Sequence, residues 1–184
     1  MKRPSRSPVK LLRLLLAAAL AGAVGACGYR FSAAGGPLPK GAVSVQVPTF
    51  RNRTPEAGFE ALLTHELREE LERTGHGAGG SADASLDGVV ETIGAMPLAL
   101  KAAPPATGGS SLVPYNPGLY QTVVTVSVKL VRGAELLAQI DHLQLTEPYL
   151  PSDDLATNEA NRRLALRRLA HALAKEIVQR LAAQ

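Results

Sequence analysis

The sequence predicts an α+β domain in which a four-stranded, mostly antiparallel or mixed sheet carries two helices on one face. Two observations lead to this prediction. Two stretches repeat leucine at helical spacing, whereas four other stretches alternate apolar residues as strands do. Their order along the chain is strand, helix, three strands, helix. The simplest burial places both helices on the apolar face of the sheet and leaves the other face to solvent or to a partner.

Residues 1–26 are predicted to be a lipoprotein signal peptide that is removed. Basic residues without any acid precede the apolar run Leu14–Ala26, which is too short to cross a bilayer comfortably. The run ends in a Val-Gly-Ala triplet directly before Cys27, the only cysteine of the chain. This ending resembles the lipobox of bacterial lipoproteins, which implies a diacylglycerol on the Cys27 thiol, cleavage before it and a further N-acyl chain. The alternatives are an ordinary secretory signal with a chance cysteine and an uncleaved anchor.

The remaining chain divides into a tether and one domain. Residues 27–41 comprise the acylated Cys27 and a stretch rich in Gly, Pro, Ser and Ala, and residues 42–184 are long enough for one domain with its own core. Stable anchoring needs about two acyl chains, so the lipid alone holds the protein on a membrane. Gly28 stands where an Asp would favour retention in the inner membrane, which favours a location on the periplasmic side of the outer membrane.

The charge of the mature chain gives no indication of nucleic-acid binding. The formal charge of the full sequence is +4, but five of its 20 basic residues and none of its 16 acidic residues precede Cys27. The mature chain therefore has a formal charge of −1, and the high isoelectric point belongs to the signal peptide. With Cys27 acylated, no thiol is left for a disulfide or a thiolate metal site.

The predicted strands show apolar residues on alternate positions. In the first of them, Val43, Val45 and Val47 share one face. The stretch Met96–Gly118 is rich in Pro, Gly, Ser and Ala and is predicted to be a long loop. The four strands are expected at Ala42–Val47, Asp83–Ala95, Leu119–Val131 and Leu136–Thr146.

Both predicted helices have one leucine-rich face. The first begins with Thr54 as N-cap and Pro55 at its first position, and it ends near Arg73. The last helix spans about Leu155–Leu181. The apolar face of the first helix comprises Phe59, Leu62, Leu63, Leu67 and Leu71, and its outer face Glu66, Arg68, Glu69, Glu70, Glu72 and Arg73. The apolar stripe of the last helix comprises Leu166, Leu169, Leu173, Ile177 and Leu181.

No residue pattern indicates catalysis, a metal site or a cofactor. The four histidines lack metal-ligand spacing, and no serine or cysteine lies in a nucleophile motif. Asp141 and His142 are neighbours in a predicted strand, so their side chains are expected on opposite faces. The last helix carries an excess of basic residues between Asn161 and Arg180. This face is either simply solvated or contacts an anionic partner.

Several sequence segments together resemble the LptE family of lipopolysaccharide-assembly lipoproteins. They are CGYRF at Cys27, PTFRNRT before the first helix and NEANRR at the start of the last helix, in the family's order and spacing. The resemblance implies two helices on a four-stranded sheet, no enzymatic activity and no cofactor apart from the acyl chains. It further implies a plug inside an LptD-type outer-membrane β-barrel that assists barrel assembly and lipopolysaccharide insertion.

The resemblance also suggests where lipopolysaccharide would touch the chain. In relatives, basic residues near a hairpin tip and ahead of the last helix are implicated in this contact. The corresponding candidates are Lys101, Arg162 and Arg163. The alternative function is a periplasm-facing lipoprotein that binds a small or lipid ligand on the open sheet face or in the Met96–Gly118 loop, without a barrel partner.

Overall fold

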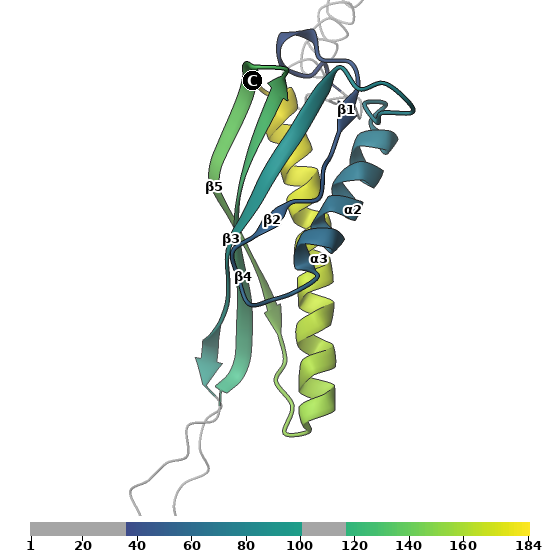
Figure 1. Ribbon diagram of the computed structural model, residues 1–184. Helices are drawn as coiled ribbons and strands as arrows, with labels where there is room; N and C mark the ends of the chain where they lie inside the picture. The colour runs from purple at the N-terminus through teal and green to yellow at the C-terminus, as the bar shows by residue number, and fades with distance from the viewer. Residues whose placement is uncertain (1–35, 101–116) are drawn as a thin grey trace, which may run out of the picture. The chain divides into compact units, whose positions relative to one another are not determined.

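The computed structural model describes residues 36–100 and 117–184, and the domain it shows has the predicted α+β architecture (Figure 1). Three long strands form most of the sheet, and two helices cover one of its faces. The elements in chain order are η1 (Pro39–Gly41), β1 (Val45–Gln46), β2 (Arg51–Asn52), α2 (Phe59–Arg73), β3 (Ala84–Leu100), β4 (Pro117–Arg132), β5 (Glu135–Tyr149) and α3 (Leu155–Ala182).

The sheet is mixed. Its order is β1-β3-β4-β5, and β2, a short fifth strand in a segment that was predicted to be a loop, also pairs with β3. Strands β3, β4 and β5 are antiparallel neighbours joined in order, whereas the short β1 and β2 run parallel to β3 along its outer edge. The chain crosses from β2 to β3 through α2, which places this helix over the sheet as parallel connections require.

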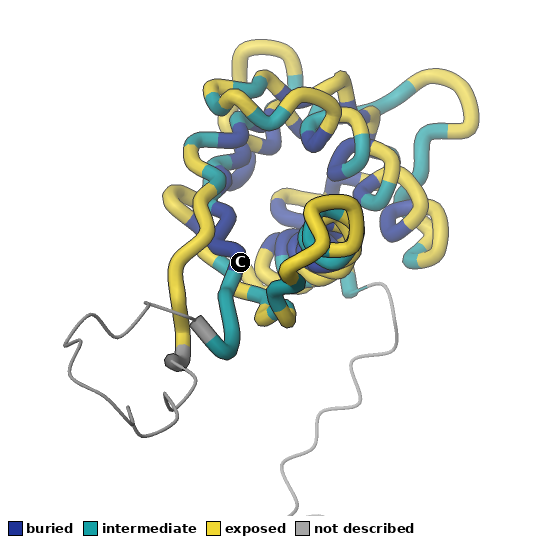
Figure 2. Tube along the Cα trace, turned by 90° about the horizontal axis from the view of Figure 1, so that it is seen from below, coloured by how far each residue is buried: buried dark blue, intermediate teal, exposed yellow. Residues whose placement is uncertain are grey.

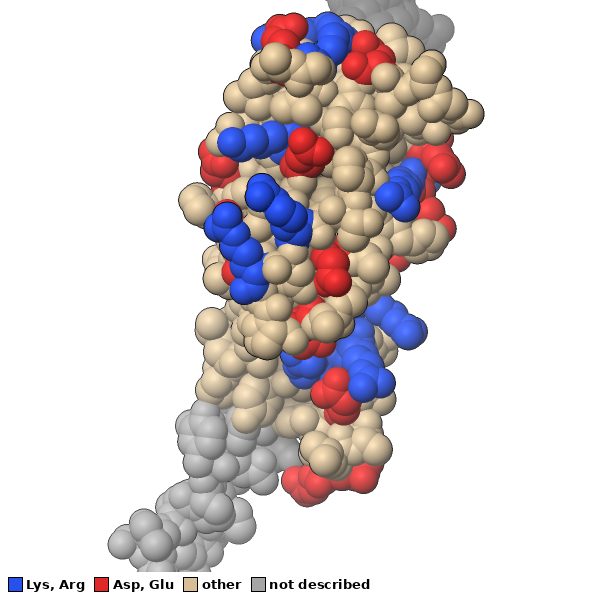
Figure 3. All heavy atoms as spheres, viewed as in Figure 1, with Lys and Arg blue, Asp and Glu red and all other residues tan. Residues whose placement is uncertain are grey.

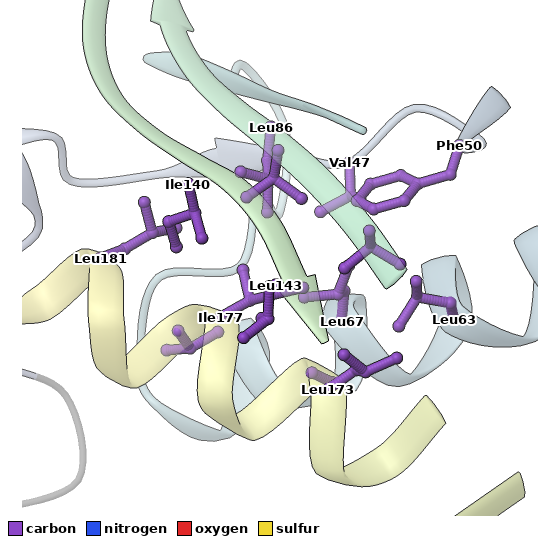
Figure 4. Close-up of a cluster of buried hydrophobic side chains, with 14 of the residues drawn as sticks. Val47, Phe50, Leu63, Leu67, Leu86, Ile140, Leu143, Leu173, Ile177 and Leu181 are labelled. Atoms are coloured by element: carbon purple, nitrogen blue, oxygen red, sulfur yellow. The ribbon is translucent and has the colours of Figure 1, made fainter. Parts of the chain in front are cut away.

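The core lies between the helices and one face of the sheet. In Figure 4, Leu63 and Leu67 of α2 and Leu173 and Ile177 of α3 point toward the side chains of the strands, and all four leucine and isoleucine side chains are fully buried. Seen from below in Figure 2, the buried positions of the sheet and of the helices face the space between them. The alternation predicted for β3 is confirmed, because Ala84, Leu86, Gly88 and Val90 are all buried.

Phe50 is the aromatic side chain that fits most closely into this core. A Cβ atom on Gly88 of β3 would lie 2.1 Å from the Phe50 ring, so only glycine leaves room for it. The backbone N–H of Phe50 donates to the Thr64 hydroxyl of α2 at 3.1 Å. Phe50 therefore holds the segment between β1 and α2 against both the sheet and the helix.

The first strand is shorter than predicted. Only Val45 and Gln46 pair with β3, and Val43 is 70% exposed. The N–H of Val43 donates to the Asp83 carboxylate instead of joining the ladder. The expectation that Val43 shares the buried face of Val45 is therefore wrong.

The end of the predicted tether packs on the domain. Leu38 is 2% exposed, and η1 follows it. The Lys40 ammonium donates to the Glu135 carboxylate at 2.7 Å, at the turn between β4 and β5. Residues 38–41 thus belong to the folded domain that was expected to begin at residue 42.

Helix α2 begins at Phe59, four residues later than Pro55. The Asn52 side chain accepts hydrogen bonds from the N–H and the hydroxyl of Thr54, which bends the chain away from helical geometry. Gly58 then precedes the helix with φ +93°, a conformation that glycine adopts easily. The predicted cap at Thr54 is wrong, because its side chain takes part in this turn.

Glu70 was expected on the outer face of α2 but is 6% exposed. The Arg73 guanidinium donates to both of its oxygens, with Nε at 2.8 Å from Oε2. This hydrogen bond, reinforced by the positive charge, lowers the pKa of Glu70. An arginine one turn away therefore compensates the burial of this carboxylate.

The β3–β4 hairpin extends farther than predicted. Residues Met96–Leu100, expected in the loop, continue β3 and pair with β4 as far as Leu100 opposite Pro117. Pro97 is tolerated because β1 and β2 pair only with the first half of β3, which leaves its second half as an edge strand. The rest of the predicted Met96–Gly118 loop, residues 101–116, lies outside the described residues.

Strand β5 contains an irregularity that the sequence did not predict. Its register with β4 shifts between Ile140 and Leu143, so Asp141 and His142 together stand opposite Ser127. Both side chains of this pair are exposed. The expected alternation to opposite faces is therefore interrupted at Asp141 and His142.

We expect Leu173→Ala to lower the free energy of unfolding by about 2–5 kcal/mol, because its side chain fills the core between α3 and the sheet. Chemical denaturation of the purified protein measures this change. Leu164→Ala is the matched control in the same helix, because Leu164 is 47% exposed. Equal losses in the two variants would contradict the assignment of the core.

We expect Thr122→Val to raise the free energy of unfolding by about 1 kcal/mol. The Thr122 hydroxyl is fully buried and has no hydrogen-bond partner among the described residues, and valine has nearly the same shape. Thr125→Val is the control, because Thr125 is partly exposed. A loss of stability in Thr122→Val alone would show that the hydroxyl has a partner.

Candidate partner-binding surface

The predicted site residues are only partly within the described structure. Cys27 and Lys101 lie outside the described residues. Arg162 and Arg163 are neighbours in the N-terminal third of α3, but their surroundings differ. The candidate surface is therefore built from α3, from the start of α2 and from the distal half of the β3–β4 hairpin.

Arg162 ties two elements of the domain together. Its side chain is 25% exposed and donates to the carboxylate of Glu56, in the segment before α2, with Nη1 at 3.3 Å from Oε1. A second carboxylate, that of Glu159, lies 3.7 Å away in the same helix. The Arg162 guanidinium is thus already paired with carboxylates of the domain.

Arg163 remains available to a partner. Its side chain is 69% exposed and contacts the Glu159 carboxylate, one turn away, at 3.0 Å. Such an exposed pair contributes little to stability and is easily exchanged for another anion. Of the two arginines, Arg163 is the one that a ligand can reach.

The predicted basic face of α3 is neutralised in part, by acids of α3 itself and of other elements. Arg168 contacts Glu147 of β5 at 3.3 Å, and His171 contacts Glu66 of α2 at 2.9 Å. Within the described part of the chain, Arg167 and Lys175 form no ion pair. On the face that Figure 3 draws, positive and negative side chains are interspersed and form no continuous basic patch.

A shallow groove of about 340 Å³ lies between the start of α2 and α3. Phe59, Leu62 and Leu166 contribute apolar side chains to it, and Arg163 and Arg167 contribute the positive charge. Apolar surface beside exposed guanidinium groups suits an anionic amphiphile better than a small polar metabolite.

The second part of the surface is uncharged. We call Thr92–Leu100 and Pro117–Val126 the β3–β4 arm. Between Glu91 and Lys129 the sequence contains one charged residue, Lys101, which lies outside the arm. Met96 and Leu98 are 47% and 53% exposed, and the surface over this part of the sheet in Figure 3 carries no charged side chain.

The arm continues into a second groove, of about 310 Å³, between the end of β5 and the first turns of α3. Leu119, Leu150 and Leu164 line it, and Tyr149 stacks on Tyr120 with ring centroids 5.7 Å apart. Burial raises the pKa of the Tyr149 phenol, which stays neutral at physiological pH. Leu150 and Leu164 are exposed beside this groove, which makes it a candidate surface for a partner.

The sequence contains the signal for the arm but not for the groove. The lack of charge between Glu91 and Lys129 is visible in the sequence, within a range that includes the predicted Met96–Gly118 loop. Leu150 and Leu164 lie on either side of the groove only because β5 and α3 pack side by side. In the described ranges no three potential metal-ligating side chains converge, and neither described helix is long and apolar enough to cross a bilayer.

Known proteins share this fold. No curated protein sequence matches the chain. Rare lipoprotein B from Shewanella oneidensis superposes with a TM-score of 0.50 at 15% identity, covering 75% of this chain and 95% of the other. Uncharacterized lipoprotein B from Nitrosomonas europaea superposes with a TM-score of 0.52 at 12% identity, covering 84% and 88%.

The sequence itself matches a family model over most of the domain. The model describes LptE, lipopolysaccharide-assembly, and it matches residues 42–181. This range begins before β1 and ends within the last turn of α3, so it contains the whole sheet and both helices. The chain therefore belongs to the LptE family of lipopolysaccharide-assembly proteins.

Proposed function

We propose that this protein is an outer-membrane lipoprotein, acylated at Cys27, that acts as the plug of an LptD-type β-barrel. In this role it assists assembly of the barrel and insertion of lipopolysaccharide, and it performs no chemical reaction. The family match over residues 42–181 is the observation that carries the proposal.

The described surface supports a protein partner. Non-obligate interfaces combine an apolar centre with a polar rim and few unpaired charges at the centre. The β3–β4 arm and the Leu119–Leu150–Leu164 groove supply apolar area, and the ion pairs of α3 supply a polar surround. The polar surround suits a plug, because the lumen of a large barrel is polar.

The proposal is tested by affinity purification of the tagged, acylated protein from detergent-solubilised outer membranes. We expect one large β-barrel protein at a near one-to-one ratio. An unrelated lipoprotein with the same tag is the control for detergent carry-over. If the protein is present in the outer membrane but no barrel is recovered, the proposed partnership is wrong.

The groove beside Arg163 and Arg167 favours a second function, direct contact with an anionic lipid such as lipopolysaccharide. This contact requires neither a barrel nor Arg162. Of the three sequence candidates, Lys101 remains a proposal from the resemblance, Arg163 is supported by its exposure, and Arg162 is better explained as a structural tie.

We expect Arg162→Ala and Arg163→Ala to separate these roles. Arg162→Ala should lower the free energy of unfolding by about 1–3 kcal/mol, because it leaves the partly buried Glu56 carboxylate without its partner. Arg163→Ala should change stability by less than about 0.5 kcal/mol but weaken binding to lipopolysaccharide vesicles. Denaturation and vesicle co-sedimentation measure the two effects. Equal stability of the two variants would contradict the structural role of Arg162.

A further inference from the structure

Two of the register shifts in the sheet, one in β3 and one in β5, lie at the level of Val126 and Ser127 of β4. Strand β3 shifts register between Val90 and Thr92, so Glu91 has no partner in β4. Strand β5 shifts where Asp141 and His142 stand opposite Ser127. A β-bulge increases the local twist and bends its strand. Bulges in β3 and β5 at neighbouring positions of β4 are expected to add to the twist of the three long strands, which Figure 1 shows as a twisted sheet.

The side chains at this level form one hydrogen-bonded chain. The backbone N–H of His142 donates to the Ser127 hydroxyl at 2.9 Å, and this hydroxyl donates to Glu91 Oε1 at 2.6 Å. The second carboxylate oxygen of Glu91 lies 2.7 Å from Nδ1 of His142. Glu91, the unpaired residue of β3, is thereby connected across β4 to His142 in the bulge of β5.

His142 also has a conformation that is costly for a side chain with a Cβ. Its φ is +50°, in the left-handed region. Such a conformation persists where surrounding contacts hold it. The contacts of His142 with Ser127 and Glu91 are the ones that do so here.

The chain of side chains lies at a boundary in the domain. Strand β2 pairs with β3 only as far as Val90, and Arg53 makes the last backbone hydrogen bond there at 3.0 Å. Helix α2 covers the sheet before this boundary. Beyond it, the β3–β4 arm has no strand on its outer edge, and α3 is the one described helix that accompanies it (Figure 1).

We propose that Glu91, Ser127 and His142 form a proton-sensitive hinge that sets how firmly the β3–β4 arm is held relative to the rest of the domain. When Glu91 is ionised and His142 is protonated, their ion pair closes both bulges and restrains the arm. When either group becomes neutral, the restraint weakens and the arm opens more often. This inference concerns the domain alone and does not depend on the partner of the proposed function.

The neighbouring charges define the pH range in which the hinge is closed. Glu91 faces Ser127 and His142 across the sheet and the positive charge of Arg53, and these hydrogen bonds and charges lower its pKa. His142 faces Glu91 and the adjacent Asp141, and its bond to Glu91 raises its pKa. The stabilisation from His142 is complete below the ordinary histidine value of about 6.5 and is lost as pH rises through its raised pKa. The stabilisation from Glu91 is complete above its ordinary value and is lost as pH falls through its lowered pKa.

The experiment is hydrogen–deuterium exchange of the full acylated protein in detergent at pH 6 and pH 8, with rates corrected for the intrinsic effect of pH. We expect protection of peptides from Thr92–Leu100 to fall about twofold to fivefold from pH 6 to pH 8, the size expected for an exposed ion pair. Peptides from Ile177–Ala182, in the last turns of α3, should show no comparable change. A protection of the arm that is the same at both pH values would overturn the proposal.

Three variants assign the effect. Asparagine accepts a positive φ and does not titrate, so His142→Asn should abolish the pH dependence in the arm, and Glu91→Gln should do the same. His171→Asn removes a similar pair, with Glu66 at 2.9 Å between the helices, and should leave the pH dependence of the arm intact. Persistence of the dependence in His142→Asn would overturn the proposal. If Glu91→Gln does not fold, an NMR titration of the His142 imidazole in the native protein tests the ion pair instead. A measured pKa at or below about 6.5 would contradict the ion pair.

Discussion

The structure depends on the burial of one apolar sheet face beneath two leucine-rich helices. The core consists mainly of leucine, valine, isoleucine and alanine, with Phe50 and Phe59 as its buried aromatic residues among those described. Each buried leucine or valine contributes about 1.5–3 kcal/mol, so stability rests on the number and regular spacing of these side chains. The leucines of α2 and α3 form one core cluster with the inward side chains of β3, β4 and β5.

The lengths of the elements explain why the domain has an uncovered end. Helix α2 has 15 residues and α3 has 28, which corresponds to about 22 Å and 42 Å at the helical rise per residue. Strand β3 has 17 residues, or about 56 Å at the rise of a strand. Strands β3 and β4 therefore extend past α2, and the β3–β4 arm contains no charged residue. An extended hairpin without charges is suited to contact with a partner, in agreement with a role in the assembly of a larger complex.

The polar contacts of the domain keep its elements in position and limit the basic surface. Glu56, Glu66 and Glu147 come from three different elements, and each lies beside a basic side chain of α3. On the opposite side of the sheet, Glu91 joins the two bulges through Ser127 and His142. The carboxylates thus act mainly between elements, which explains why an apparent basic helix in the sequence becomes a surface of mixed charge in the fold.

The sequence by itself determined the fold class, the order of the long elements and the inward faces of both helices, because leucine spacing and strand alternation are local consequences of helix and strand geometry. Segments ahead of the helices, such as PTFRNRT, also carried the family resemblance. Only the tertiary structure decided features that depend on contacts between distant residues. Among these are the pairing of Arg162 with Glu56 and the bulges at Glu91 and His142. Hydrogen bonds and ion pairs across the sheet or between elements fix these features, and a local pattern contains no information about which distant group completes them.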